Sequence, residues 1–119
     1  MGLKYSDELY IGTSGLLLPV ANKTFYPDDY KDKSRLAFYG SLFSSIEVNS
    51  SFYKIPLAST VCKWKNEVPE YFRFSFKLFK GITHAKNLIY DPLLVTKFLD
   101  VVAQAKEKSG CLLLQFPAS

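Results

Sequence analysis

The stretch Phe72-Arg73-Phe74-Ser75-Phe76-Lys77-Leu78 decides the fold class, because its apolar and polar residues alternate strictly. A period of two predicts a β-strand with unlike faces. One face carries the apolar side chains of Phe72, Phe74, Phe76 and Leu78. The other carries Arg73, Ser75 and Lys77.

The chain after this strand reads as a helix and then a further strand. Asp91 followed by Pro92 is a strong helix start. The expected buried stripe of that helix is Leu94, Val95, Phe98, Leu99 and Val102. Lys106, Lys108 and Gly110 are expected to end the helix. The apolar run Cys111–Phe116 then predicts a strand that is covered on both faces.

The chain before the alternating strand repeats the same order. Residues 9–11 read as a short strand, closed by a Gly12–Gly15 loop that lacks the spacing of phosphate-binding loops. Ser34 caps a helix that runs to Phe43, with Leu36, Tyr39, Leu42 and Phe43 on one face. A strand over residues 46–49 follows. Ser59 or Thr60 then caps a short helix that turns Val61 and Trp64 inward.

Alternation of strands and helices predicts a parallel sheet with right-handed crossovers, hence an α/β protein. With 119 residues the chain is expected to form one small domain. An α/β unit usually covers its last strand with a helix, and none follows residue 116. We therefore expect either a longer protein or a partner that covers this edge.

Composition narrows the class of protein. Hydrophobic residues make up 48% and charged residues 22%, which indicates a globular chain. Aromatic residues reach 16%, which favours a sizeable core or an aromatic-lined cleft. The net charge of +4 permits an anionic partner, but the dispersed lysines favour plain solubility over nucleic-acid binding. No apolar run approaches the length of a membrane span.

The cysteines and the histidine limit the chemistry. Cys62 and Cys111 both stand among apolar residues, so we expect small core residues in a reducing cytoplasm rather than a disulfide scaffold. The charged N-terminus is no signal peptide. His84 is the single histidine, so this chain alone cannot build a multi-histidine metal site.

A candidate site lies in the run Ile46-Glu47-Val48-Asn49-Ser50-Ser51-Phe52-Tyr53, which begins apolar and turns polar. Because a strand alternates its faces with period two, Glu47, Asn49 and Ser51 are predicted to share one face. The carboxyl end of a strand is where α/β proteins place their chemistry. A solvated strand edge that runs into a turn is the alternative interpretation.

Several motifs occur in a recognisable order. They are Ile11–Gly15, Phe25-Tyr26-Pro27, Glu47–Tyr53, Val68-Pro69, Phe72–Phe74 with Lys77, Gly81-Ile82-Thr83-His84 and Leu114–Pro117. Together they resemble the YecE-like family, domain of unknown function 72, from about Tyr10 to Ser119. The resemblance departs at Leu16, where the family often has Trp, and at Lys80-Gly81, where it often has Pro-Arg.

The resemblance implies a (β/α)8 TIM-type barrel, of which residues 1–119 would supply the N-terminal half and about the first four strands. A partner chain or a missing C-terminal half would have to close the barrel. Truncation is the simpler explanation of the length, and symmetric pairing of two half-barrels is the alternative. The active site would lie at the carboxyl ends of the strands. The residues expected there are Ser14, Glu47, Asn49, Lys77, His84 and Gln115.

Glu47 is the candidate general base or nucleophile. Lys77 beside it would keep its carboxylate ionised or hold an anionic substrate group, unless the two form a structural ion pair. His84 either transfers protons or is structural. Asn49 and Gln115, with Ser14, would hydrogen-bond substrate or pin loops. Tyr53 would stack on a sugar or base or simply pack the rim, and no metal or cofactor is identified.

These residues favour a hydrolase or lyase that acts on a sugar- or phosphate-bearing substrate. A glycosidase needs two carboxylates, and the second would come from the other half. Metal-dependent phosphodiester cleavage fits less well, since this half offers mainly Glu47 and His84. The alternatives are a non-catalytic binding module for an anionic ligand or nucleic acid, and a chain that is inactive alone and aggregates or dimerises through its sheet edges.

Overall fold

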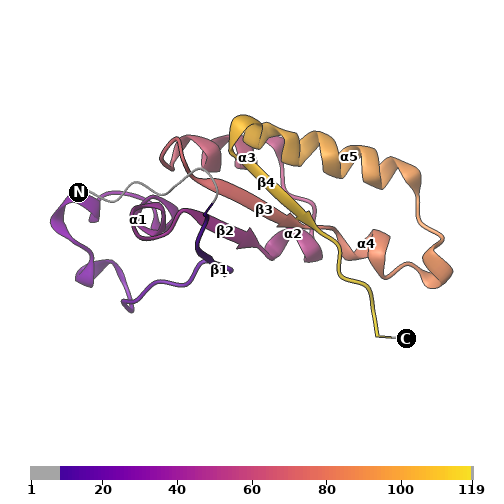
Figure 1. Ribbon diagram of the computed structural model, residues 1–119, viewed down its shortest axis with the longest axis horizontal. Helices are drawn as coiled ribbons and strands as arrows, with labels where there is room; N and C mark the ends of the chain where they lie inside the picture. Colours follow the sequence, from indigo (N-terminus) through magenta and orange to yellow (C-terminus); the bar gives the residue numbers. More distant parts are fainter. Residues whose placement is uncertain (1–8, 119) are drawn as a thin grey trace.

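The computed structural model describes residues 9–118 and contains one parallel sheet whose strands follow each other in chain order, β1-β2-β3-β4 (Figure 1). The strands are β1 (Gly12–Ser14), β2 (Ser45–Val48), β3 (Arg73–Lys77) and β4 (Ser109–Leu113). All three pairings are parallel. The predicted α/β class with a parallel sheet is therefore confirmed.

Helices fill the connections between the strands. The three longer ones are α1 (Arg35–Leu42), α3 (Ala58–Asn66) and α5 (Pro92–Val102). Two one-turn helices, α2 (Ser50–Tyr53) and α4 (Lys80–Thr83), follow the carboxyl ends of β2 and β3. Short 3₁₀ segments are η1 (Lys23–Phe25), η2 (Asp28–Tyr30), η3 (Lys86–Leu88) and η4 (Ala103–Lys108). Within residues 9–118 no helix has the length and apolarity to cross a membrane.

The sheet has two unlike faces. On the covered face Ile46, Val48, Phe74 and Phe76 are buried and pack in one cluster with residues of all three longer helices. The opposite face carries the half-buried polar side chains of Ser45, Glu47, Ser75 and Lys77. The alternation of Phe72–Leu78 is confirmed, since its four apolar side chains are all buried. One face of the sheet is therefore core, and we call the other the open face.

The tyrosine of α1 joins this helix to the first two strands. Tyr39 is fully buried, and its hydroxyl accepts from the Thr13 N–H at 2.8 Å and lies 2.9 Å from the Ser45 carbonyl oxygen. The caps that begin α1 and α5 are as predicted: Ser34 Oγ accepts from Ala37 N, and Asp91 Oδ1 accepts from Leu93 N. Local sequence therefore sets where both helices begin.

Helix α3 begins earlier than predicted, and its C-terminal end is held by a distant lysine. Its first residue is Ala58 and its N-cap is Leu57, so Ser59 and Thr60 lie inside the first turn instead of capping it. At its C-terminal end the buried ammonium of Lys108 donates to Lys65 O and to Val68 O, both at 2.8 Å. Lys108 thus satisfies one carbonyl in the last turn of α3 and one just after it, whereas the sequence predicted that it ends the later helix.

Strand β1 lies three residues later than predicted, in Gly12–Ser14 rather than in residues 9–11. A Cβ built on Gly12 would lie 1.8 Å from the Ser45 carbonyl oxygen, so the close approach of β1 to β2 requires glycine here. The residue after the strand, Gly15, has φ +82°. The predicted glycine loop is thus a strand followed by a left-handed turn.

The end of the chain is more exposed than the sequence predicted. Strand β4 is exposed along its whole length rather than covered on both faces, and Phe116 beyond it is 51% exposed. Nothing in the described part of the chain lies on the free edge of this strand. Gly110 belongs to β4, and α5 ends at Val102 before a left-handed turn at Lys106 (φ 54°).

Three further expectations about the core were wrong. Cys62 and Cys111 are both exposed, because one lies on the outer side of α3 and the other on the uncovered last strand. Leu99 is 45% exposed and Val101 is buried, since the buried side chains Phe98, Val101 and Ala105 follow each other at intervals of three and four residues. Leu42 at the end of α1 is 38% exposed.

Candidate functional site

Three polar residues stand side by side on the open face. Ser14 is in register with Glu47, and Glu47 is in register with Ser75. Partner residues of parallel strands point to the same side of the sheet, so the three side chains project together. A shallow hollow of about 340 Å³ lies over them, and its lining also includes Cys111. This is where the topology places the predicted acid.

Glu47 and Lys77 share the open face but form no salt bridge within residues 9–118, where the one ion pair joins Lys31 and Asp28 at 3.6 Å. The Lys77 ammonium instead lies 4.7 Å from the ring centroid of Phe52. Glu47 itself is half-buried. The carboxylate and the ammonium are therefore two separate features of the strand ends, and the structural ion pair considered from the sequence is not formed.

Asn49 leaves the strand before its side chain can share the face of Glu47. It is the N-cap of α2 and has helical backbone angles. Its Nδ2 donates to Ser14 Oγ at 2.7 Å, so the ends of β1 and β2 are joined by two predicted site residues. Its Oδ1 is buried and has no partner among the residues that the structure describes. Asn49 and Ser14 are thus brought together at the edge of the open face.

Ser51 lies in α2 and not on the strand face that the sequence predicted. Its side chain is fully buried, and its Oγ lies 3.0 Å from Val48 O and 2.7 Å from Lys77 O. The period of two ends at Asn49, where the chain turns helical, so the alternation could not be extended to Ser51. This hydroxyl fixes α2 against the end of β3.

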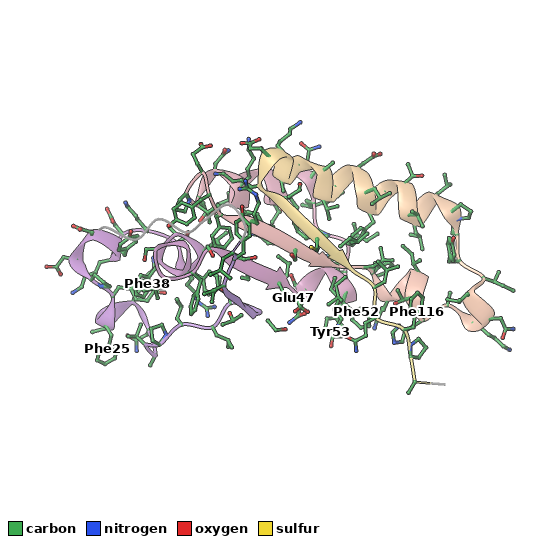
Figure 2. All side chains as sticks on the ribbon, in the orientation of Figure 1. Phe25, Phe38, Glu47, Phe52, Tyr53 and Phe116 are labelled. Atoms are coloured by element: carbon green, nitrogen blue, oxygen red, sulfur yellow. The ribbon has the colours of Figure 1, made fainter. Side chains whose placement is uncertain are left out.

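The second feature of the strand ends is a cluster that we call the lysine–aromatic rim. Its members are Phe52, Tyr53, Lys77, Lys80 and His84. The Phe52 ring lies edge-to-face with Tyr53, at 5.1 Å and 88°, and with His84, at 5.2 Å and 82°. The Lys80 ammonium lies 5.5 Å from the Tyr53 centroid. Figure 2 shows Glu47, Phe52 and Tyr53 toward the same end of the sheet, far from Phe25.

His84 belongs to this rim. It is exposed, caps the C-terminal end of α4, and has its Nδ1 2.9 Å from Thr83 Oγ1. At Gly81, three residues earlier, an added Cβ would lie 2.3 Å from the Phe79 ring, so a larger residue would force that ring to move. The Gly81–His84 motif thus places an exposed imidazole beside Phe52.

Gln115 does not join the other predicted residues. It lies beyond β4, is exposed, and makes no hydrogen bond within the described range of 9–118. The strand before it is uncovered, so nothing there orients its amide. As for metals, the described residues contain no group of three or more His, Cys, Asp or Glu side chains that could hold an ion together.

Comparison with known proteins decides the family. The family model described as "Protein of unknown function DUF72" matches residues 10–119. The chain belongs to the DUF72 family. Among curated relatives it is 32% identical to UPF0759 protein YecE of Escherichia coli K12 over 81 residues, which is 68% of this chain and 30% of that protein. It is 35% identical to UPF0759 protein YunF of Bacillus subtilis over 75 residues, 63% of this chain and 26% of that one.

A solved DUF72 structure carries the same fold. The crystal structure of a DUF72 family protein from Enterococcus faecalis V583 matches with a TM-score of 0.62 and 31% identity, over 71% of this chain and 36% of that chain. The present chain therefore spans about a third of the length of the relatives that it matches. The YecE-like resemblance is confirmed.

Sequence reasoning on this DUF72 chain missed several residues of the site. Cys111 was assigned to the core, yet it faces the hollow beside Glu47 and its N–H donates to Ser75 Oγ at 3.1 Å. Lys80 was noted as a departure from the family pattern but not as a partner of Tyr53. The one available signal was its position three residues after Lys77, directly behind the alternating strand.

Proposed function

We propose that this DUF72 chain forms the first four strands of a (β/α)8 barrel and that the open face is the inner wall of that barrel. Two observations support this: the strands are parallel and in chain order, and the longer helices all pack in the core cluster on one face. Closure requires further strands at the free edges of β1 and β4. The remainder of a longer chain would supply them, or a second copy.

The function that the geometry supports best is hydrolysis or lyase chemistry on a small sugar- or phosphate-bearing substrate. One observation carries this proposal: the half-buried Glu47 has no cationic partner in the described residues and lies in register between two hydroxyl side chains on the open face. An unpaired carboxylate in such a place can accept a proton or attack a substrate carbon or phosphorus.

Other residues have secondary roles in this proposal. The Ser14–Asn49 pair would hydrogen-bond a substrate hydroxyl beside Glu47. The lysines of the rim would hold an anionic group, Tyr53 would stack on a ring, and the exposed His84 would exchange protons with solvent. Gln115 would join only if the remaining strands ordered the chain after β4.

A specific observation favours a second candidate, a non-catalytic binding module for an anionic ligand. Among the described residues the open face offers one carboxylate, Glu47, whereas acid–base catalysis of glycoside cleavage uses two. The rim lysines and rings suffice for binding without turnover. Nucleic acid would be a ligand of this kind, and steep salt dependence would identify it.

Substrate screening separates the two functions. The purified chain is incubated with chromogenic phosphate esters and glycosides beside its Glu47→Gln variant, and product release is measured. The catalytic proposal expects release that Glu47→Gln lowers by about a hundredfold or more, while ligand-induced thermal stabilisation persists. Glu70→Gln, an exposed carboxylate in a turn, is the matched control and should leave release unchanged.

Binding without release by the wild-type chain would instead support the binding module. Release that Glu47→Gln leaves unaffected would remove Glu47 from the chemistry. If neither binding nor release is observed, the remaining alternative is a chain that is inactive alone, and light scattering would then be expected to show association through the free sheet edges.

A further inference from the structure

We propose that the lysine–aromatic rim is a subsite for a phosphate monoester whose organic part carries a planar ring, such as an aryl phosphate or a nucleoside monophosphate. The subsite rests on the anion-binding part of the proposed function. The new elements are the class of ligand and the assignment of Lys80 and Phe52 to its recognition.

The rim carries two positive charges that no neighbouring acid balances within residues 9–118. Lys77 and Lys80 bring two ammonium groups to the end of β3, and neither has a carboxylate partner in the part of the chain that the structure describes. Both groups rest over aromatic rings instead, at 4.7 Å and 5.5 Å from the centroids of Phe52 and Tyr53. Two neighbouring unpaired cations favour a ligand with more than one negative charge.

The ammonium groups of Lys77 and Lys80 can bind either an aromatic ring or a phosphate group. A cation over an exposed ring is held weakly, whereas charge-assisted hydrogen bonds to phosphate oxygens are strong and short. A phosphate would therefore draw both lysines away from Phe52 and Tyr53. The ring faces that the ammonium groups covered would then become free for stacking. A ligand with both a phosphate and a planar ring would therefore bind the lysines and the exposed ring faces together.

The rings of the rim are held in place by their neighbours. Phe52 is held on two sides by edge-to-face contacts with Tyr53 and His84. The helix α2 that carries Phe52 and Tyr53 is fixed by the buried Ser51 hydroxyl. Tyr53 nevertheless remains 67% exposed. A rim whose rings are held in place before the ligand arrives loses little conformational entropy on binding.

The planar ring distinguishes this ligand from a sugar phosphate. The cations lie over ring faces, at separations where aromatic rings also stack. The rim also carries the imidazole of His84, so three aromatic rings lie together there, with the centroids of Tyr53 and His84 at 5.1 Å and 5.2 Å from that of Phe52. A planar ring fits this surface better than a puckered sugar does.

Titration followed by amide chemical shifts tests the proposal. The probes are phenyl phosphate, adenosine 5′-monophosphate, ribose 5-phosphate, inorganic phosphate and adenosine. We expect the two ring phosphates to shift the amides of α2 and α4 and to bind about tenfold or more tightly than ribose 5-phosphate and inorganic phosphate. Equal affinity for inorganic phosphate and phenyl phosphate would overturn the ring requirement.

Variants locate the binding on the rim. The double change Lys77→Gln with Lys80→Gln should weaken phenyl phosphate binding about tenfold or more, and Tyr53→Leu should weaken it about fivefold. Lys63→Gln with Lys97→Gln, on exposed positions of α3 and α5, and Phe25→Leu, 63% exposed in η1, are the matched controls. Equal losses in the controls would contradict the proposal, as would binding of single-stranded RNA far tighter than the mononucleotide.

Glu47→Gln titrated in parallel separates this inference from the catalytic proposal. If phenyl phosphate binds both proteins at the rim and neither turns any substrate over, the rim subsite stands and the catalytic role of Glu47 fails. If sugar esters are turned over and the lysine changes alter neither binding nor rate, the subsite fails and the role of Glu47 stands.

Discussion

The hydroxyl of Ser51 lies 2.7 Å from the carbonyl oxygen of Lys77, and this contact joins the one-turn helix after β2 to the end of β3. The same hydroxyl lies 3.0 Å from Val48 O, so one buried side chain contacts the carboxyl ends of both β2 and β3. The rings of α2 and the lysine of β3 belong to the same rim. Ser51 therefore positions α2, which carries the two rings, against the strand end that carries Lys77.

Ser51→Ala should lower the free energy of unfolding by about 1–2 kcal/mol, because it leaves a buried carbonyl without its hydrogen bond. Urea unfolding followed by tryptophan fluorescence measures this. Ser50→Ala, one residue earlier and exposed, should change stability by less than about 0.5 kcal/mol. If both variants lose the same stability, Ser51 does not hold α2 in the way described.

Lys108→Met should be destabilising by about 2–3 kcal/mol, since it leaves the carbonyls of Lys65 and Val68 without their common donor. The exposed Lys106→Met is the control and should be nearly neutral. Thermal unfolding of the two variants in parallel gives the comparison. A Lys108→Met protein as stable as the wild type would show that water replaces the ammonium at these carbonyls.

Gly12→Ala should disrupt the pairing of β1 with β2, because the added methyl group meets backbone rather than a movable side chain. Gly15→Ala should cost only about 1 kcal/mol, since its Cβ has room and the penalty comes from the positive φ. Hydrogen exchange at the amides of β1 and β2 ranks the two. Faster exchange in Gly15→Ala than in Gly12→Ala would contradict this order.

Leu16→Trp should raise stability by about 1 kcal/mol by filling a cavity of about 280 Å³, lined by Leu16, Leu36, Trp64 and the covered face of the sheet. Leu17→Trp is the control, because Leu17 is 61% exposed and its larger side chain would gain no buried contacts. Chemical unfolding of both variants and of the wild type measures their free energies of unfolding. A loss of stability in Leu16→Trp would mean that the cavity walls cannot accept the indole.

Glu107 should titrate below its ordinary value of 4.5, because its own backbone N–H bonds the carboxylate, with the charges of Lys65, Lys108 and Arg73 as smaller contributions that lower the pKa further. A lowered pKa in the folded state adds stability above the unfolded value, and this stability is lost as the pH falls through the folded value. Carbon-detected NMR measures the titration directly. In Glu107→Gln, stability should fall less steeply as the pH is lowered through and below 4.5.

The sequence was sufficient wherever a local pattern determines the structure. The alternation of Phe72–Leu78 and the Asp91-Pro92 start are examples, since a strand face and a helix cap depend on residues close in the chain. The prediction failed where a distant partner decides. Gly12 belongs to β1 because its backbone packs closely against that of Ser45 in β2. Lys108 is buried because its ammonium donates to carbonyls 43 and 40 residues earlier in the chain.

The candidate site shows the same division. Glu47 could be placed on the open face because strand periodicity holds up to Val48. Ser51 was misplaced because the chain turns helical at Asn49, and Cys111 was misplaced because an apolar run does not reveal whether anything covers it. Lys77 contacts Phe52 rather than Glu47, and the spacing of these residues in the sequence does not predict that contact.

The order of strands in the sheet also has a consequence for synthesis on the ribosome. Each strand pairs with the one made just before it, across separations such as 33 residues from Ile11 to Ser44, 28 from Ser45 to Arg73 and 36 from Ser75 to Cys111. Loops of this length close at modest and similar entropic cost. The sheet can therefore form strand by strand in the order of synthesis, and β4 is the last strand to pair among the described residues 9–118.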